Sequence, residues 1–214
     1  MQQLLPLYLP STVQSDTHYI VTDCNRLAYK AIMHHRWEMP FTLLFGEACS
    51  GKTTLSHHIC AQRNATMLHH NLPESDIIGI TNGLYIIDNV HQCDERALFH
   101  MLNMIKAQHA FLLMTATGSF NTLPFTLPDT CSRLRTAMQC HIYPPDDDMM
   151  LMLLHKELSN RQLYYDEKLL HYVIPRLERS YQAIVHFVGE LDRISLVKKH
   201  SITISLAREL LNPT

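Results

Sequence analysis

Short apolar runs alternate with helix-like segments over the first two thirds of the chain. Strand-like runs lie at residues 41–45, 65–70, 84–88, 110–115 and 139–143. Helical patterns lie between them, one over about 52–63 and one after Asp94, whose side chain can cap it. Strands that are apolar along their whole length are buried on both faces, as in a parallel sheet covered by helices. The pattern therefore predicts an α/β fold with a parallel sheet.

The pattern changes to helices alone after Pro145. Three positions there can each cap a helix, namely the aspartate run 146–148, Asp166 and Ser180. Pro175 is expected to end the second of these helices, because a proline cannot continue the backbone hydrogen bonds. Residues 201–205 have an extended pattern, and Ser205 is expected to cap a last short helix.

We expect three parts, a tail over residues 1–12, an α/β core over 13–145 and a helical domain over 146–214. The length of 214 residues suits one or two domains with a substantial buried core. Eighteen Lys and Arg residues against twenty Asp and Glu residues give a formal net charge of −2. Nucleic-acid-binding modules are usually strongly basic, so we expect no direct sequence-specific binding of DNA.

Membrane insertion and metal binding are both disfavoured by the sequence. No run approaches the ~18 consecutive apolar residues of a membrane-spanning helix. The apolar N-terminus has no preceding Lys or Arg and contains two prolines, unlike a signal peptide, so we expect a cytoplasmic protein that starts at Met1. The six cysteines lack C-x-x-C spacing and are expected to be reduced. The histidine doublets suit a polar surface better than a metal site, because adjacent side chains point in different directions.

Residues 46–53, GEACSGKT, match the phosphate-binding pattern G-x-x-x-x-G-K-[ST]. The pattern lies between a predicted strand and a predicted helix, which disfavours the alternative of a glycine turn beside a solvated lysine. Backbone N–H groups at such a helix start bind phosphate oxygens, while Lys52 reaches the outer phosphates and the Thr53 hydroxyl ligates Mg²⁺. The residues predicted to bind nucleotide here are Gly46, Ala48, Cys49, Ser50, Gly51, Lys52, Thr53 and Thr54.

Asp88 ends the strand-like run 84–88 and is the expected partner of Thr53 at the Mg²⁺ ion, directly or through water. The alternative role of this carboxylate is to cap a following helix. The next residue is Asn89, at a position where many hydrolytic phosphate-loop enzymes have a carboxylate that activates water. Because an amide cannot accept a proton, we expect the chain alone to hydrolyse nucleotide weakly or not at all.

The order of these motifs resembles that of the AAA+ ATPases, and within them the group of the bacterial replication initiator DnaA and its Hda-like regulators. The most specific segments are residues 127–135, LPDTCSRLR, and 144–148, PPDDD. Similar stretches lie at residues 2–10, 176–193 and 202–210. The resemblance implies an AAA+ core followed by a small helical lid, with ATP or ADP and Mg²⁺ bound between them, in the cytoplasm of a bacterium.

The same resemblance assigns roles to several further side chains. Arg133, in the Ser132-Arg133-Leu134 motif, corresponds to an arginine finger that acts in trans on the γ-phosphate bound by a neighbouring subunit. A surface salt bridge is the alternative for Arg133. Thr115 and Thr117 correspond to a segment that senses the nucleotide, although both also suit ordinary strand ends.

One lid position departs from the family pattern. Gln182 stands where many members have an arginine that contacts the nucleotide, and Arg179 is expected to face another direction. Together with Asn89, this glutamine favours a protein that binds nucleotide and activates a partner's ATPase rather than one with its own turnover. The resemblance therefore predicts a negative regulator of replication initiation, which promotes hydrolysis of DnaA-bound ATP in the presence of the DNA-loaded sliding clamp.

The N-terminal tail resembles the short peptides that bind the replication sliding clamp. Such peptides insert a glutamine and an apolar cluster into pockets of the clamp, which implies roles for Gln2, Leu5, Pro6 and Leu7. Prolines favour an extended backbone and so lower the cost of ordering the tail on a partner. The alternative is that the leucines pack on the protein's own surface.

Two other classes of function stay open at this point. The chain could be an independent phosphate-loop ATPase or small-molecule kinase, although the sequence lacks the arginine-rich lid of such kinases. It could also be a loader or adaptor that delivers another replication protein. The preference between ATP and ADP, and the presence of a homo-oligomer, are not determined by the sequence.

Overall fold

The computed structural model describes residues 14–16, 19–33, 39–198 and 202–211. The chain divides into two compact units. One unit comprises Asn25–Pro144, and the other joins Met1–Cys24 to Pro145–Thr214. The segment 14–24, which the sequence analysis placed with the core, thus packs with the C-terminal helices.

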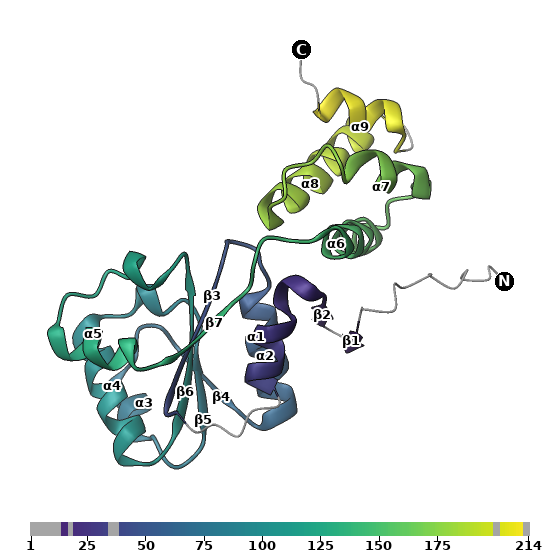
Figure 1. Cartoon of the computed structure of the whole chain (residues 1–214). Coiled ribbons are helices and arrows are strands. Elements are labelled where there is room, and N and C mark those ends of the chain that lie inside the picture. The colour runs from purple at the N-terminus through teal and green to yellow at the C-terminus, as the bar shows by residue number, and fades with distance from the viewer. Residues whose placement is uncertain (1–13, 17–18, 34–38, 199–201, 212–214) are drawn as a thin grey trace. The chain divides into compact units, whose positions relative to one another are not determined.

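The first unit is built on a five-stranded parallel sheet (Figure 1). Its strands are β3 (Phe41–Gly46), β4 (Thr66–Leu68), β5 (Leu84–Ile87), β6 (Phe111–Thr117) and β7 (Met138–His141). Their order is β4-β5-β6-β3-β7, so β6 lies between the strand that leads into the phosphate loop and the strand that precedes Asp88. The predicted parallel α/β fold is confirmed.

Helices cover both faces of this sheet (Figure 1). One face carries α1 (Asp23–Met33) and α2 (Lys52–Arg63), and the other carries α3 (Glu74–Ile78), α4 (Glu95–Ala107) and α5 (Pro128–Arg135). Short 3₁₀ turns lie at Val90–Gln92 and Phe120–Thr122. As predicted, Asp94 caps α4, where its side chain accepts a 2.9 Å hydrogen bond from the Ala97 N–H.

The sheet core is apolar because the strand residues are buried on both faces. Phe41, Leu43 and Phe45 of β3 pack in one cluster with apolar residues of β6 and α4. The neighbouring Leu44 points to the opposite face and is also fully buried. Burial of such side chains contributes roughly 1.5–3 kcal/mol each, which fixes the strand ends that carry the candidate site.

The second unit contains four helices among its described residues, α6 (Asp147–Asn160), α7 (Glu167–Val173), α8 (Tyr181–Lys198) and α9 (Ile204–Leu211). A short antiparallel pair of strands, β1 (Gln14–Asp16) and β2 (Tyr19–Val21), precedes α1. The predicted caps Asp146, Asp166 and Ser180 each accept a backbone N–H at a helix start. The prediction for Ser205 is wrong, because α9 already begins at Ile204 and the side chain of Thr203 accepts the Leu206 N–H.

Asp146 ties the start of α6 to the segment that follows β2. One carboxylate oxygen accepts hydrogen bonds from the Thr22 hydroxyl at 2.8 Å and from the Cys24 N–H at 3.0 Å. The other oxygen accepts the Met149 N–H at 2.7 Å. The Cys24 thiol in turn lies 3.3 Å from the Tyr181 hydroxyl, at the start of α8. These contacts explain why residues from the two ends of the chain form one unit.

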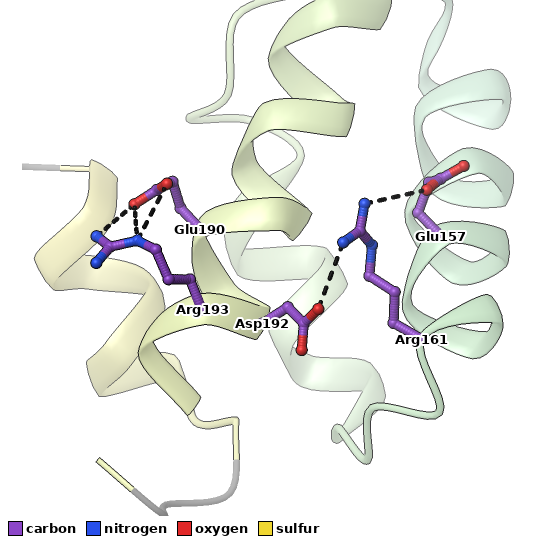
Figure 2. A network of polar contacts seen from close by, with 5 residues as sticks. All are labelled: Glu157, Arg161, Glu190, Asp192 and Arg193. Carbon is purple, nitrogen blue, oxygen red and sulfur yellow. Dashed lines mark hydrogen bonds and ion pairs between the residues drawn. The ribbon is translucent and has the colours of Figure 1, made fainter. Parts of the chain in front are cut away.

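Ion pairs on the surface of the second unit add little to its stability (Figure 2). Arg161 lies 3.4 Å from Asp192 of α8 and 4.0 Å from Glu157 of α6. Arg193 lies 2.7 Å from Glu190 one turn earlier, and this hydrogen bond lowers the pKa of Glu190. Exposed pairs of this kind are screened by solvent and contribute little, so the apolar helix interface dominates. No helix among the described residues combines the length and apolarity needed to cross a membrane.

Candidate functional site

The loop between β3 and α2 has tight backbone geometry. Two of its residues adopt a left-handed conformation, and one glycine has no room for a side chain. Cys49 and Gly51 both have positive φ angles, 63° and 84°. A Cβ on Gly46 would lie 2.6 Å from the Ser50 hydroxyl oxygen and 3.2 Å from Ile142 Cβ. The two glycines of the motif are therefore required by the close approach of the loop and by the turn into α2.

Lys52 begins α2, and its ammonium group folds back over the loop. The residue is only 6% exposed. Its Nζ donates hydrogen bonds to the carbonyl oxygens of Gly46 at 2.9 Å and Glu47 at 2.6 Å. Burial lowers the pKa of Lys52, and the negative charge of Asp88 opposes this shift. The ammonium is thus held at the loop by weak carbonyl acceptors that a phosphate group can replace.

Asp88, which follows β5, is linked to two threonines from neighbouring elements. The Thr53 hydroxyl of α2 donates to one carboxylate oxygen at 2.6 Å. The Thr115 hydroxyl of β6 donates to the other at 2.5 Å and accepts the Asn89 N–H at 2.9 Å. Because β5 and β6 are parallel neighbours, their carboxyl ends place these groups at one edge of the sheet.

Asn89 lies beside this carboxylate in a left-handed conformation, with φ 55° and ψ 54°. Asparagine adopts such angles more readily than most residues. Its side-chain amide donates to Asp88 at 3.4 Å. The amide therefore orients the carboxylate and supplies no proton acceptor of its own.

A cleft of about 340 Å³ lies over this loop. It is lined by Ala48, Cys49, Ser50, Gly51, Lys52, Thr53, Thr54, Asn89 and Thr117. The first N–H groups of α2 have no acceptor within the helix, and the buried Ser50 hydroxyl has no hydrogen-bond partner in the part of the chain that the structure describes. A helix start with unused donors and a buried lysine fits a phosphate group. Thr53 and Asp88 offer the oxygen ligands that Mg²⁺ prefers.

Arg133 lies on α5, away from the phosphate loop. It is half-buried, and its guanidinium carbon lies 5.7 Å from the centre of the Phe99 ring of α4. It lines a second cleft, of about 380 Å³, together with Lys106, Asp129, Ser132 and Thr136. Arg135 of the same helix is exposed and lies 5.9 Å from the Phe120 ring.

Glu95, in the first turn of α4, fixes the start of α5. One of its carboxylate oxygens accepts the N–H groups of Thr126 at 2.6 Å and Leu127 at 2.7 Å. The other oxygen accepts the Thr126 hydroxyl at 3.2 Å. These residues come directly before Pro128, the first residue of α5, so the carboxylate sets where the helix that carries Arg133 begins.

The structure brings together the predicted phosphate-loop residues with Asp88 and Thr115, and it places Arg133 at a separate cleft of the same unit. Thr117 lines the first cleft. Gln182 belongs to the second unit, where it lines a pocket between α8 and α9. The tail residues Gln2, Leu5, Pro6 and Leu7 lie outside the described residues.

Two residues beside α5 were not found from the sequence. In the sequence, Glu95 is an acidic residue in the first turn of a helix and Lys106 is a lysine in its last turn. Only their position relative to α5 distinguishes them. The capping pattern around Asp94 is the one sequence signal close to either residue, and it does not extend to α5.

The C-terminal part of the chain matches a family model. Residues 146–211 match the model described as the Hda lid domain. This segment covers α6 to α9, and it begins at the cap of α6.

Solved structures with the same fold extend the comparison to both units. Domain III of the Thermotoga maritima replication initiation protein DnaA superposes with a TM-score of 0.71 at 17% identity, over 92% of this chain and 94% of that one. The Thermotoga maritima RuvB Holliday junction branch migration motor gives a TM-score of 0.61 at 18% identity, over 86% of this chain and 64% of the RuvB chain.

A third structure, of replication initiator DnaA bound to AMPPCP and single-stranded DNA, gives a TM-score of 0.63 at 14% identity, over 85% of this chain and 66% of that one. These identities are low, so the likeness to solved structures concerns the fold. Together with the lid match, they show that the chain has the α/β fold of these proteins, followed by a segment, residues 146–211, that matches the Hda lid domain.

Proposed function

We propose that the chain binds an adenine nucleotide with Mg²⁺ at the phosphate loop. The support is the fit of the loop to phosphate, with unused N–H donors at the start of α2, the unpartnered Ser50 hydroxyl and the buried Lys52 ammonium. Lys52 moves from the loop carbonyls to the phosphates, and Thr53 and Asp88 hold the Mg²⁺ ion. The bound metal neutralises phosphate charge, while the protein residues orient the nucleotide.

The nucleotide serves this protein as a structural ligand more than as a substrate. Asn89 donates its amide to Asp88 and has no group that removes a proton from water. Steady-state hydrolysis by the isolated protein should therefore lie well below ~1 s⁻¹, the low end of typical enzyme turnover. A turnover near that value would instead favour an independent ATPase.

The function that the site supports best is activation of a partner's ATPase in trans, with ATP-bound DnaA as the partner. The single observation that carries this proposal is Arg133, a half-buried arginine that lines a surface cleft on α5 and forms no ion pair among the described residues. Its guanidinium stabilises charge that develops on the γ-phosphate in the partner's site. The likeness in fold to DnaA and the Hda lid match support the choice of partner.

An experiment with a matched pair of arginine variants tests this role. Purified protein is mixed with ATP-loaded DnaA and clamp-bearing DNA, and the conversion of ATP to ADP is followed. We expect Arg133→Ala to lose about 10³-fold of the stimulated rate while it still binds nucleotide. Arg135→Ala serves as the control, because this exposed arginine lies on the same helix and also contacts an aromatic ring. Equal stimulation by the Arg133 variant would reject the proposal.

Recruitment by the sliding clamp is the second part of the proposal. It rests on the resemblance of residues 2–7 to clamp-binding peptides, with Gln2, Leu5, Pro6 and Leu7 as the contacts. A pull-down with the clamp compares the full chain with one that lacks residues 1–10. We expect the shortened chain to lose clamp binding but to keep its nucleotide-dependent stabilisation. Unchanged clamp binding would remove the tail from the proposal.

A further inference from the structure

The cleft that contains Arg133 also contains a second cation. It is lined by Lys106 of α4, by Asp129, Ser132 and Arg133 of α5, and by Thr136, which follows α5. Lys106 stands in the last turn of α4, and Arg133 in the last turn of α5. Two helices that are separated in the sequence thus bring two positive side chains to one surface cavity.

The charges of this cleft are not balanced within the part of the chain that the structure describes. Neither Lys106 nor Arg133 forms an ion pair there. Asp129 is the one carboxylate among the lining residues. The Thr136 hydroxyl already donates to the Arg133 carbonyl at 2.8 Å, whereas Ser132 is exposed. A group that enters the cleft meets two cations, one anion and two exposed hydroxyls, of which that of Thr136 already donates to a carbonyl.

A purely structural role for Lys106 would be to complement the dipole of α4. A cation in the last turn of a helix stabilises it by roughly 0.3–1 kcal/mol. Lys30 occupies the same kind of position, exposed in the last turn of α1. Helix α1 lies on the opposite face of the sheet from α4 (Figure 1). Lys30 can therefore stabilise its helix in the same way as Lys106, but it is not part of the cleft.

We propose that Lys106 is a second phosphate-binding residue, which acts together with Arg133 on the outer phosphates of the nucleoside triphosphate held by the partner. This inference rests on the proposed trans-activation. In the partner, water adds to the γ-phosphorus as the bond to the β–γ bridging oxygen breaks, which yields the diphosphate, inorganic phosphate and a proton. Arg133 binds the phosphate oxygens with a planar fork, and Lys106 adds a point charge. Neither residue exchanges a proton or an electron pair.

Saturation curves of the stimulated hydrolysis test the inference. The partner, ATP-loaded DnaA with clamp-bearing DNA, is kept fixed while the full chain is titrated as wild type, Lys106→Gln, Lys106→Arg or Lys30→Gln. We expect Lys106→Gln to lower the maximal rate about tenfold, because a hydrogen bond to a charged group is lost in the transition state. Its half-saturating concentration should stay that of the wild type. Lys106→Arg should recover most of the rate, and Lys30→Gln should match the wild type.

Three results would overturn the inference. The first is a wild-type maximal rate for Lys106→Gln, and the second is an equal loss for Lys30→Gln, which would indicate a helix-dipole effect. The third is a raised half-saturating concentration with an unchanged maximal rate, which would place Lys106 against an acidic surface of the partner. Arg133→Ala, measured in parallel, distinguishes a failure of the Lys106 inference from a failure of the proposed trans-activation. If it loses stimulation while Lys106→Gln does not, only the role of Lys106 fails.

Discussion

The two clefts of the α/β unit use their charged groups in opposite ways. At the phosphate loop, Lys52, Asp88 and Thr115 are all bonded to groups of the same chain. At the cleft between α4 and α5, the cations Lys106 and Arg133 have no anionic partner among the described residues. We propose phosphate ligands for both clefts, yet among the described residues the lysine of the first cleft is held by carbonyl groups of its own chain, whereas the cations of the second have no anionic partner.

The difference follows from burial. A lysine as buried as Lys52 must be hydrogen-bonded, because an unpaired charge removed from water is strongly destabilising. Lys106 is exposed and Arg133 is half-buried, so water satisfies them at little cost. A buried lysine can therefore hold a ligand by exchange of partners, whereas cations that are exposed or half-buried are suited to a group that another molecule brings.

Lys52→Met should have the largest effect, on the first cleft alone. A ligand at about a hundredfold excess over its Kd stabilises the folded state by about 2.7 kcal/mol. We expect the variant to lose this gain, because the cation that attracts the phosphates is missing. Thermal unfolding with and without ADP and Mg²⁺ measures the shift. Lys30→Met should retain the full shift, and retention by Lys52→Met would show that the loop lysine does not contact the nucleotide.

Glu95→Ala should weaken the second cleft without changing the first. The carboxylate accepts three hydrogen bonds from Thr126 and Leu127, so its loss should cost about 2 kcal/mol and loosen the start of α5. Thermal unfolding measures the cost, and stimulated hydrolysis reports on the position of Arg133. Glu95→Gln, which keeps one carbonyl oxygen, should behave almost as wild type. Full stimulation by the alanine variant would mean that α5 does not depend on this contact.

Thr115→Val should have the smallest effect, about 1 kcal/mol of stability. It removes the hydroxyl that bridges Asp88 and the Asn89 N–H, at a fully buried position of similar volume. Differential scanning calorimetry of the nucleotide-free protein measures the loss. Thr117→Val is the control, since that threonine is exposed at the end of the same strand. Equal stability of both variants would show that the bridge adds nothing to the folded state.

The elements of the sheet could be predicted because local signals agreed with the fold. Apolar runs marked the strands, and the caps Asp94, Asp146 and Asp166 marked helix starts. The failure at Ser205 is instructive. Thr203 can cap the same helix, and two polar candidates only two positions apart cannot be separated by local pattern alone. The pairing of β1 with β2 was not predicted from the sequence.

Some residues of the candidate site could likewise be predicted from the sequence, and others could not. The phosphate loop could be predicted because its backbone needs glycine at fixed spacing, and Asp88 because it follows a buried strand. Thr115 contacts Asp88 because β6 lies between β3 and β5. This strand order could not be predicted from any short segment of the sequence. Glu95 and Lys106 were missed for the same reason, since their meaning depends on where α5 packs against α4.

The contacts of Asp146 have a practical consequence for the design of protein fragments. The family match begins at residue 146, which invites expression of the four helices as a separate fragment. That fragment would lack Thr22 and Cys24, the groups that occupy one oxygen of the Asp146 carboxylate. The helical unit is discontinuous in the sequence, so a fragment that keeps these contacts joins residues 14–24 through a linker to residues 145–211.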